Sequence, residues 1–247
     1  MFSIFQRRVR VHRYLPGGVD AHCHLLPGVD DGAPNMETAL GIIRVLQSLG
    51  LRGAVCTPHI MSRYPDNTPA NLRARFAELL ATVQQDASTS GNPQAFDLYL
   101  AAEYMLDDAF LSLLEQPENL LAIPAKLVRQ GSDSCGNSEG AADYVLLELP
   151  QYLQPEGWQD ALDAVRRAGY TPLLAHPERY LRILSEADLR QLHARGLRYQ
   201  GNLGSLAGIY GPQVQKLARR LHRAGLYTTF GTDAHSPSMV EKMELSA

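Results

Sequence analysis

Apolar segments of strand length alternate with amphipathic segments of helix length along nearly the whole chain. The strand candidates are residues 18–24, 51–57, 96–104, 143–150, 170–176, 197–203 and 226–235. The helix candidates are residues 35–50, 69–86, 107–115, 156–169, 185–196 and 212–225. Strands that alternate with helices of this length form βαβ units and a parallel sheet, which predicts an α/β fold. The seven strand candidates favour a barrel over an open sheet.

Residues 120–143 interrupt this alternation. Their first part predicts a small hairpin, and the Gly/Ser-rich stretch 131–142 predicts a flexible surface excursion. No other linker stands out, so we expect residues 19–247 to form a single domain behind a basic tail, residues 1–18. The tail combines apolar residues with four arginines, and a weak contact with an anionic membrane surface is the alternative to a solvated tail.

Charge and cysteine content narrow the class of protein. The formal net charge of −3 lacks the basic excess of a nucleic-acid-binding protein. The three cysteines are odd in number and show no CxxC spacing, which is typical of a reducing compartment. No apolar run has the length of a membrane span, and the first residues lack the order of a secretory signal. These features predict a cytoplasmic globular enzyme.

Side chains typical of metal ligands stand at the ends of six of the seven strand candidates. In chain order they are His22 and His24, His59, Glu103, Glu148, His176, and Asp233 and His235. The sixth strand ends in Asn202 instead. Because the carboxyl ends of barrel strands converge on one rim, we expect these side chains to meet there.

The spacing in the first strand supports a metal site. His22 and His24 share one face of the strand, whereas Cys23 points to the opposite face. Asp31 follows in the next loop, close enough to return to the rim. The set then holds five histidines and four carboxylates, which exceeds the four to six ligands of one ion and suits two or three. Without a thiolate, the donors favour zinc, manganese or iron.

Some candidates have a structural alternative. Glu148 is either a ligand or a buried carboxylate that pairs with Arg179. Arg179 lies at the rim, where its planar fork fits phosphate, and Arg63 is a second candidate anion anchor. Asp30 is expected to shape a turn rather than to bind metal. Three other histidines are expected to lie on the surface or in the tail: His12, His193 and His222.

Several hydrolase motifs are missing from the chain. No cysteine is followed by an arginine six residues later, which the loop of a cysteine phosphatase requires. The sequence has no P-loop and no G-x-S-x-G motif. None of the three lysines follows a strand candidate, so a carbamylated lysine ligand is not expected. Glu103 is the candidate for a bridging ligand.

Six motifs resemble those of the polymerase and histidinol phosphatase (PHP) superfamily. They are DAHCHLLPGVDDGA, TPHIMSRYP, AAEY, LLAHPERY, NLGSLAGIYG and GTDAH, and the resemblance runs from Val19 to His235. More narrowly, the motifs resemble those of bacterial manganese-dependent protein-tyrosine phosphatases of capsule and exopolysaccharide synthesis. The resemblance implies a distorted (β/α)7 TIM-like barrel, the PHP fold, with a trinuclear centre. Manganese (Mn²⁺) is the metal that it implies, with iron and zinc as alternatives.

The resemblance also implies a role for each motif residue. One ion would be held by His22, His24, Glu103 and Asp233, a second by Glu103, Glu148 and His176, and a third by Asp31, His59 and His235. Arg179 would bind phosphate, and catalysis is assigned to Arg179, Asp31 and His235. Some relatives carry another arginine just past the last histidine. This sequence has none there, so phosphate binding rests on Arg179 with the metals or on another arginine.

The expected reaction is metal-assisted hydrolysis of a phosphomonoester by water, without a phosphoenzyme. The resemblance implies that the substrate is phosphotyrosine in the tail of an autophosphorylating membrane tyrosine kinase. A small-molecule phosphatase, for example one for histidinol phosphate, is the main alternative. A non-catalytic PHP scaffold domain is another, although the complete set of candidate ligands argues against it. A nuclease is disfavoured because the chain lacks a basic stripe.

Overall fold

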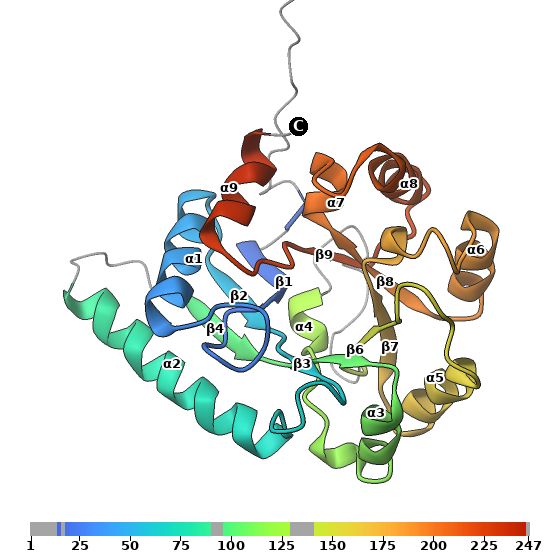
Figure 1. The fold of residues 1–247 in the computed structure, drawn as a ribbon, viewed down its shortest axis with the longest axis horizontal. Helices are drawn as coiled ribbons and strands as arrows, with labels where there is room; N and C mark the ends of the chain where they lie inside the picture. Colours follow the sequence, from blue (N-terminus) through green and yellow to red (C-terminus); the bar gives the residue numbers. More distant parts are fainter. Residues whose placement is uncertain (1–13, 16–17, 90–95, 129–140, 246–247) are drawn as a thin grey trace, which may run out of the picture.

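The computed structural model describes residues 14–15, 18–89, 96–128 and 141–245. Most of the basic tail and most of the predicted surface excursion lie outside these residues. The described part is a mixed α/β fold whose strands curve round a common interior, with helices on the outside (Figure 1). Within the described ranges, no helix has both the length and the apolar character that crossing a membrane requires.

The strands lie in two sheets, and every neighbouring pair within a sheet is parallel. They are β1 (Val19–Cys23), β2 (Gly53–Cys56), β3 (His59–Ile60), β4 (Asp97–Leu100), β5 (Glu103–Met105), β6 (Tyr144–Glu148), β7 (Thr171–Ala175), β8 (Arg198–Asn202) and β9 (Thr229–Gly231). The strand orders are β1-β2-β4 and β3-β5-β6-β7-β8-β9. The prediction of a parallel α/β fold is therefore confirmed.

The single strand predicted for residues 96–104 is wrong, because the structure divides this segment into β4 and β5. β4 pairs with β2, whereas β5 pairs with β3 and β6. At the break, the Ala102 amide donates to the carbonyl of Leu121 (3.1 Å) rather than to the neighbouring strand. The neighbouring segment is interrupted at Pro58, which has no amide proton to donate. Both interruptions lie just before residues of the candidate site.

The first and last strands meet. Cys23 and Ala234 form a parallel bridge, the His24 amide donates to the carbonyl of Ala234 (3.0 Å), and the Asp233 amide donates to the carbonyl of His22 (2.8 Å). The backbones approach closely here because residue 231 is glycine. A Cβ atom on Gly231 would lie 2.5 Å from the Cβ of His22. The first strand and the segment that follows the last strand are thereby joined beside the candidate ligands.

Most helices pack against the outside of the strands, as Figure 1 shows for α1, α2, α3, α5, α6 and α8. The helices are α1 (Met36–Ser48), α2 (Pro69–Thr89), α3 (Asp108–Leu113), α4 (Ala125–Val128), α5 (Trp158–Arg167), α6 (Glu186–Ala194), α7 (Leu203–Ala207), α8 (Pro212–Arg223) and α9 (Pro237–Leu245). The part of the chain that the structure describes also has the 3-10 turns η3 (Pro117–Asn119) and η4 (Pro177–Arg179). The sequence pattern did not predict α7 and α9.

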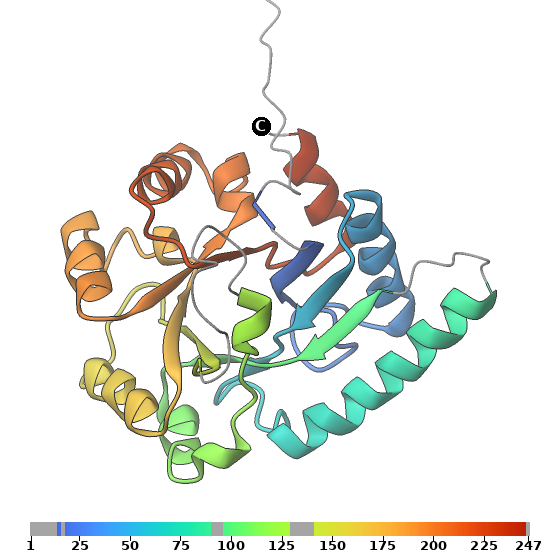
Figure 2. The same ribbon diagram turned by 180° about the vertical axis from the view of Figure 1, so that it is seen from behind.

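The hairpin predicted for the first part of residues 120–143 is wrong. This segment forms the helical turn α4, because the Asp143 side chain accepts a hydrogen bond from the Ala125 amide (2.9 Å). Just before the turn, Ile123 forms an isolated antiparallel bridge with Tyr144. Figure 2 shows α4 in front of the strands on the side opposite to the view in Figure 1.

Two apolar clusters follow from the alternation of side chains along the strands. One cluster fills the interior and includes Val55, Leu146 and Leu173 with Ala125 and Val128 of α4. The larger cluster lies between the strands and the outer helices. On β6, Leu146 belongs to the interior cluster, and Glu148, two residues later, has the same orientation. The side chains that face the interior are therefore apolar along the strands and are candidate metal ligands at the carboxyl ends of the strands.

Candidate metal centre

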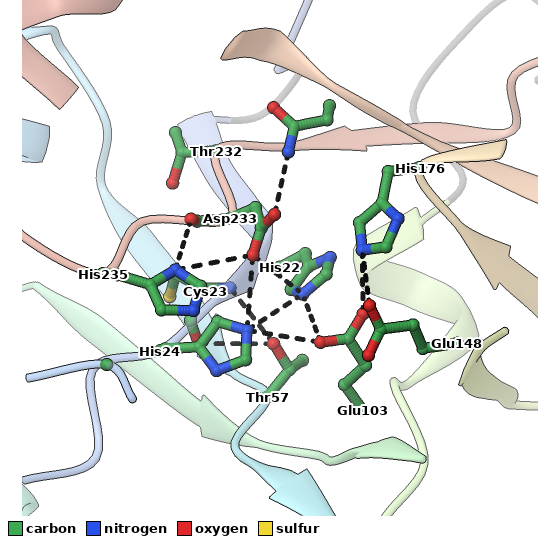
Figure 3. Close-up of polar contacts among 12 residues, drawn as sticks. His22, Cys23, His24, Thr57, Glu103, Glu148, His176, Thr232, Asp233 and His235 are labelled. Carbon is green, nitrogen blue, oxygen red and sulfur yellow. Dashed lines mark hydrogen bonds and ion pairs between the residues drawn. The ribbon is translucent and has the colours of Figure 1, made fainter. Parts of the chain in front are cut away.

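The nine predicted ligand side chains come from the carboxyl ends of the strands and the loops that follow. Distances below 4 Å connect all of them into one cluster, most of which is drawn in Figure 3. Its members are His22, His24, Asp31, His59, Glu103, Glu148, His176, Asp233 and His235. All except Asp31 and His235 are buried. Convergence of the candidates, predicted from strand ends alone, is confirmed.

Glu103 lies at the centre of the cluster. Its Oε2 atom lies 3.2 Å from His22 Nε2, 3.3 Å from His24 Nε2 and 3.3 Å from His59 Nδ1. Its Oε1 atom lies 3.1 Å from His176 Nε2. One carboxylate thus faces four imidazoles, which is the arrangement expected of a bridging group.

Hydrogen bonds on the far side of three imidazoles fix which nitrogen faces the cluster. His22 Nδ1 donates to Gln200 Oε1 (2.9 Å), and His24 Nδ1 donates to Asp30 Oδ2 (2.9 Å). His235 Nδ1 donates to the carbonyl of Asp233 (2.8 Å). In each ring Nε2 is therefore the atom left for a cation. Outer partners of this kind orient the histidine ligands of metal sites and raise their basicity.

Cys23 faces away from the cluster, as the strand geometry predicted. Its thiol donates to the carbonyl of Val55 (3.2 Å), and the side chain is buried in the outer apolar cluster. Burial raises the pKa of the Cys23 thiol well above its usual value. Because the thiolate is the nucleophilic form, this cysteine is unsuited to attack phosphorus.

Two strand ends carry backbone strain. Among the described residues other than glycine, His176 (φ 31°) and Asp233 (φ 54°) are the ones with a positive φ. Such conformations cost free energy and occur mainly at functional sites. Here the turn after each strand directs a side chain into the cluster, so the strain has a direct structural consequence.

Eight of the nine candidate residues fall into three overlapping groups of donor atoms, and His176, which the resemblance assigned to the second ion, belongs to none of them. Within each group the candidate atoms lie within 4.8 Å of one another. The groups are His22, His24, Glu103 and Asp233; His59, Glu103 and Glu148; and His24, Asp31, His59 and His235. The first equals a set implied by the family resemblance. In the others, His59 and His24 join groups to which the resemblance did not assign them.

The chemistry of these donors fits metal ions. The Nε2 atoms of His22 and His24 lie 3.3 Å apart and face the same carboxylate oxygens. Two imidazole lone pairs and two carboxylates repel one another unless a cation or protons lie between them. In addition, His176 Nδ1 is buried without a hydrogen-bond partner, and His59 Nδ1 faces Glu103 without forming a hydrogen bond. The residues present are therefore able to hold metal.

Without metal, protons take the place of the cation. Burial alone would lower the pKa of His22, but the carboxylates of Glu103 and Asp233 outweigh it and raise the pKa to about 9. Burial and Arg179 lower the pKa of His176 to about 4. Burial and the nearby charge of Glu103 raise the pKa of Glu148 well above its usual value. The carboxylates of Asp233, Asp30 and Glu103 likewise raise the pKa of His24 well above its usual value. Protons therefore concentrate at His22, His24 and Glu148.

Arg179 borders the cluster, but it does not pair with Glu148 or Glu178. Its Nη1 atom donates to Asp233 Oδ2 (2.8 Å), and its guanidinium carbon lies 4.8 Å from the centre of the Tyr210 ring. Arg179 is still partly exposed, with 20% of its side chain accessible. It is thus held beside the candidate ligands with part of its fork free for an anion.

Arg63 occupies a different position. Its side chain is exposed, and its guanidinium carbon lies 5.5 Å from the centre of the Tyr64 ring. That ring is nearly parallel to His59, with 6.2 Å between the ring centres. Arg63 and Tyr64 line one end of a cleft of about 600 Å³ that extends along α2 to Glu78. This cleft therefore begins next to the cluster.

Sequence reasoning missed several residues that hold the site. Asp30, expected only in a turn, accepts hydrogen bonds from the Gly32 amide and from the His59 amide (2.9 Å each), besides that from His24. Gln200 orients His22, and Asn202 Nδ2 donates to Asp233 Oδ2 (2.9 Å). The polar residues at the end of β8 were a signal for this role, since every neighbouring strand ends in a ligand.

Comparison with known proteins decides the family. A family model for capsular polysaccharide synthesis, CpsB/CapC, matches residues 18–128 and 132–243. The chain belongs to the CpsB/CapC family.

Two relatives of the chain are named as tyrosine-protein phosphatases, one of them as putative. The tyrosine-protein phosphatase YwqE of Bacillus subtilis (strain 168) is 28% identical over 221 residues, which is 88% of this chain and 77% of YwqE. CapC of Staphylococcus aureus is 25% identical over the same shares of the two chains. The nine candidate ligands thus lie in a chain of CpsB/CapC type.

A solved structure of the same family has a similar fold. It comes from work on YwqE from Bacillus subtilis and CpsB from Streptococcus pneumoniae, described as unique metal-dependent tyrosine phosphatases. The match has a TM-score of 0.72 at 26% identity and covers 90% of this chain and 81% of the other. The CpsB/CapC fold therefore extends over nearly the whole chain.

Proposed function

We propose that this CpsB/CapC protein is a metal-dependent protein-tyrosine phosphatase of capsule or exopolysaccharide synthesis. One observation carries the proposal: the phosphate-matching guanidinium of Arg179 is bonded to Asp233, whose other oxygen lies among the imidazoles of the cluster. The Asp233 carboxylate therefore contacts both the candidate phosphate-binding group and the candidate metal ligands. The family relatives named as tyrosine phosphatases support the choice of substrate.

The ligand assignment is part of this proposal. His22, His24, Glu103 and Asp233 would hold one ion, and Glu103 would bridge to a second held with Glu148, His59 and His176. Asp31 and His235, with His59 or His24, would hold a third. Manganese is the proposed metal, and zinc or iron suits the same oxygen and nitrogen donors.

In the proposed reaction, the bound metals supply Lewis-acid stabilisation and an activated water for attack on phosphorus. Arg179 donates hydrogen bonds to the phosphoryl oxygens, where negative charge must be neutralised. Asp233 holds the guanidinium in place through its 2.8 Å contact, and Tyr210 covers one face of it. The phenolate leaving group has a pKa of about 10, so it needs less protonation than an alkoxide.

The finer features of fold and setting also belong to this proposal. If β2 with β3, and β4 with β5, each count as one bent strand, the strands correspond to a distorted (β/α)7 barrel of PHP type. We place the protein in the cytoplasm, where its substrate is the phosphorylated tail of a membrane tyrosine kinase. The parallel pairing from β3 round to β9, together with the Cys23–Ala234 bridge back to β1, supports the barrel description.

The test compares two substrates on protein of known metal content. Protein stripped with a chelator and reloaded with Mn²⁺ is assayed on a phosphotyrosine peptide and on histidinol phosphate. We expect chelation to abolish hydrolysis, Mn²⁺ to restore it, and the peptide to have the higher kcat/KM. Preference for histidinol phosphate would identify a small-molecule phosphatase. Loaded protein that hydrolyses neither ester would identify a scaffold.

Cys23→Ser is the matched control for a cysteine mechanism. The Cys23 thiol points to the carbonyl of Val55 and not to the cluster, so the serine variant should retain most activity. Thiol reagents should likewise leave the wild type active. A complete loss of activity in Cys23→Ser, with fold and metal content intact, would overturn the metal mechanism.

A further inference from the structure

Two loops beside the metal centre expose large apolar side chains. Tyr152 is 72% exposed, Leu153 is 70% exposed and Leu181 is 40% exposed. Among the described residues, the one other large apolar side chain with such exposure is Leu111, on α3. Scattered exposed leucines are ordinary, but a group of them on neighbouring loops is typical of a binding surface.

The two loops form one surface. The Arg182 guanidinium lies 5.0 Å from the centre of the Tyr152 ring, and the Gln154 side chain donates to the carbonyl of Ile183. We call Tyr152, Leu153, Leu181 and Arg182 the rim patch. Figure 1 shows the two loops leaving β6 and β7 towards α5 and α6. Because the loops are hydrogen-bonded to each other, the apolar side chains keep a common position.

The rim patch adjoins the site. Glu148 ends β6 four residues before Tyr152, and Arg179 precedes Leu181 by two residues. A chain segment spans at most about 3.6 Å per residue. The Leu181 backbone therefore lies within about 7 Å of the Arg179 backbone, and the Tyr152 backbone lies within about 14 Å of the Glu148 backbone. A peptide whose phosphotyrosine sits at the metal centre reaches that distance with about four extended residues.

We propose that the rim patch binds an apolar side chain lying within four residues of the phosphotyrosine in a protein substrate. The inference rests on the proposed function and adds a preference for sequence around the phosphotyrosine. The bound side chain is expected to be apolar because three of the four residues of the rim patch expose apolar atoms. The fourth, Arg182, places its guanidinium over the Tyr152 ring. The charged residues that line the cleft beyond Tyr64 are two cations and two anions, namely Arg63, Asp66, Arg75 and Glu78, and Arg75 pairs with Glu78.

The test uses peptides with one phosphotyrosine among glycine and serine, and a series with a single leucine at each position up to four residues away. For the wild type, leucine at one or more positions should raise kcat/KM about fivefold, as expected for a partly buried side chain. Tyr152→Ser/Leu153→Ser should lose this gain, and Leu181→Ser should reduce it. p-Nitrophenyl phosphate, which has no peptide chain, reports on the metal centre alone and should be hydrolysed at the wild-type rate.

Leu111→Ser is the matched control, because it removes an exposed leucine (49% exposed) from α3, outside the two loops. It should retain the full leucine preference. If the double variant keeps the preference while p-nitrophenyl phosphate is turned over, the inference is overturned and the proposed function stands. If the variant keeps its peptide kinetics but loses self-association in ultracentrifugation, the patch is an interface between copies, which also overturns the inference. Failure to hydrolyse either substrate in the wild type would overturn both.

Discussion

At the scale of single residues, Asp233 connects the two parts of the site. One carboxylate oxygen lies 3.6 Å from His22 Nε2 and 3.4 Å from His24 Nε2. The other accepts hydrogen bonds from Arg179 (2.8 Å) and Asn202 (2.9 Å). Any change in the position of the arginine is therefore transmitted to a candidate metal ligand, and the reverse holds as well.

Arg179→Ala should reduce kcat/KM on a phosphotyrosine peptide by about 10²-fold or more, because it removes a donor to the transition-state charge. Arg179→Lys should restore activity only in part, since an ammonium group cannot reproduce the two-pronged contact. Metal content by elemental analysis should stay at the wild-type level, since Asn202 still bonds Asp233. A near-wild-type kcat/KM would indicate that Arg63, and not Arg179, binds the phosphate. Loss of metal would indicate that Arg179 has a structural role.

Asp30→Asn should weaken Mn²⁺ binding by about 10- to 100-fold, the usual effect of losing an outer partner of a ligating histidine. The aspartate accepts from His24 Nδ1 and from two backbone amides, and an asparagine amide group would present N–H to one of these donors. Titration calorimetry measures the affinity. Asp97→Asn, which changes an exposed aspartate on β4, is the control and should bind Mn²⁺ normally. Equal affinities for the two variants would contradict this role of Asp30.

At the scale of elements, the helix ends are set by local side chains, and α6 illustrates this well. Ser185 Oγ accepts from the Asp188 amide (3.2 Å), while Asp188 accepts from the Ser185 amide (2.8 Å). This reciprocal cap holds the start of α6 directly after the loop that carries Leu181 and Arg182. The cap therefore contributes both to stability and to the position of the rim patch.

Ser185→Ala should lower the free energy of unfolding by about 1 kcal/mol, the typical value of a helix N-cap. For a chain of this size that corresponds to a fall in Tm of about 2–4 °C. Scanning calorimetry of metal-loaded protein measures it. Ser112→Ala, near the end of α3, removes a serine whose hydroxyl donates to the Asp108 carbonyl in the preceding turn, and the Tm of this variant should not fall. A comparable loss in both variants would argue against the capping role.

At the scale of the whole molecule, we expect metal binding and folding to be coupled through the protons of the cluster. The pKa of His22 is raised from 6.5 to about 9 without metal, so its contribution to stability is complete below pH 6.5 and is lost as pH rises through about 9. Metal must displace the same proton. Its affinity should therefore rise with pH over this window.

Metal-free protein should consequently lose thermal stability between pH 6.5 and 9, whereas Mn²⁺-loaded protein should not. At a free Mn²⁺ concentration of about 100 times the Kd, binding to one site should add about 2.7 kcal/mol of stability. Elemental analysis should find more than one ion per chain. Calorimetry in buffers of different ionisation enthalpy should detect protons released on binding. A stoichiometry of one or less after Mn²⁺ reconstitution would refute the multinuclear centre.

The sequence by itself determined what depends on neighbours along the chain. Alternating segments specified a parallel α/β fold, and the i, i+2 spacing placed His22 and His24 on one face with Cys23 on the other. The helix predicted for residues 35–50 contains α1, whose start is capped by Asn35, which accepts from the Thr38 amide (2.9 Å). Convergence of the ligands also followed, because parallel strands deliver their carboxyl ends to one side.

Only the tertiary structure decided which groups pair across the rim. The bond from His22 to Gln200 joins residues 178 positions apart, and that from Arg179 to Asp233 joins residues 54 positions apart. The partners of β4 and β5, and hence the break between them, depend in the same way on distant strands. Such contacts depend on strand order and register, which place residues side by side regardless of their separation in the sequence. Local patterns therefore identified the candidate ligands, and the assembled strands decided which of them gather round Glu103.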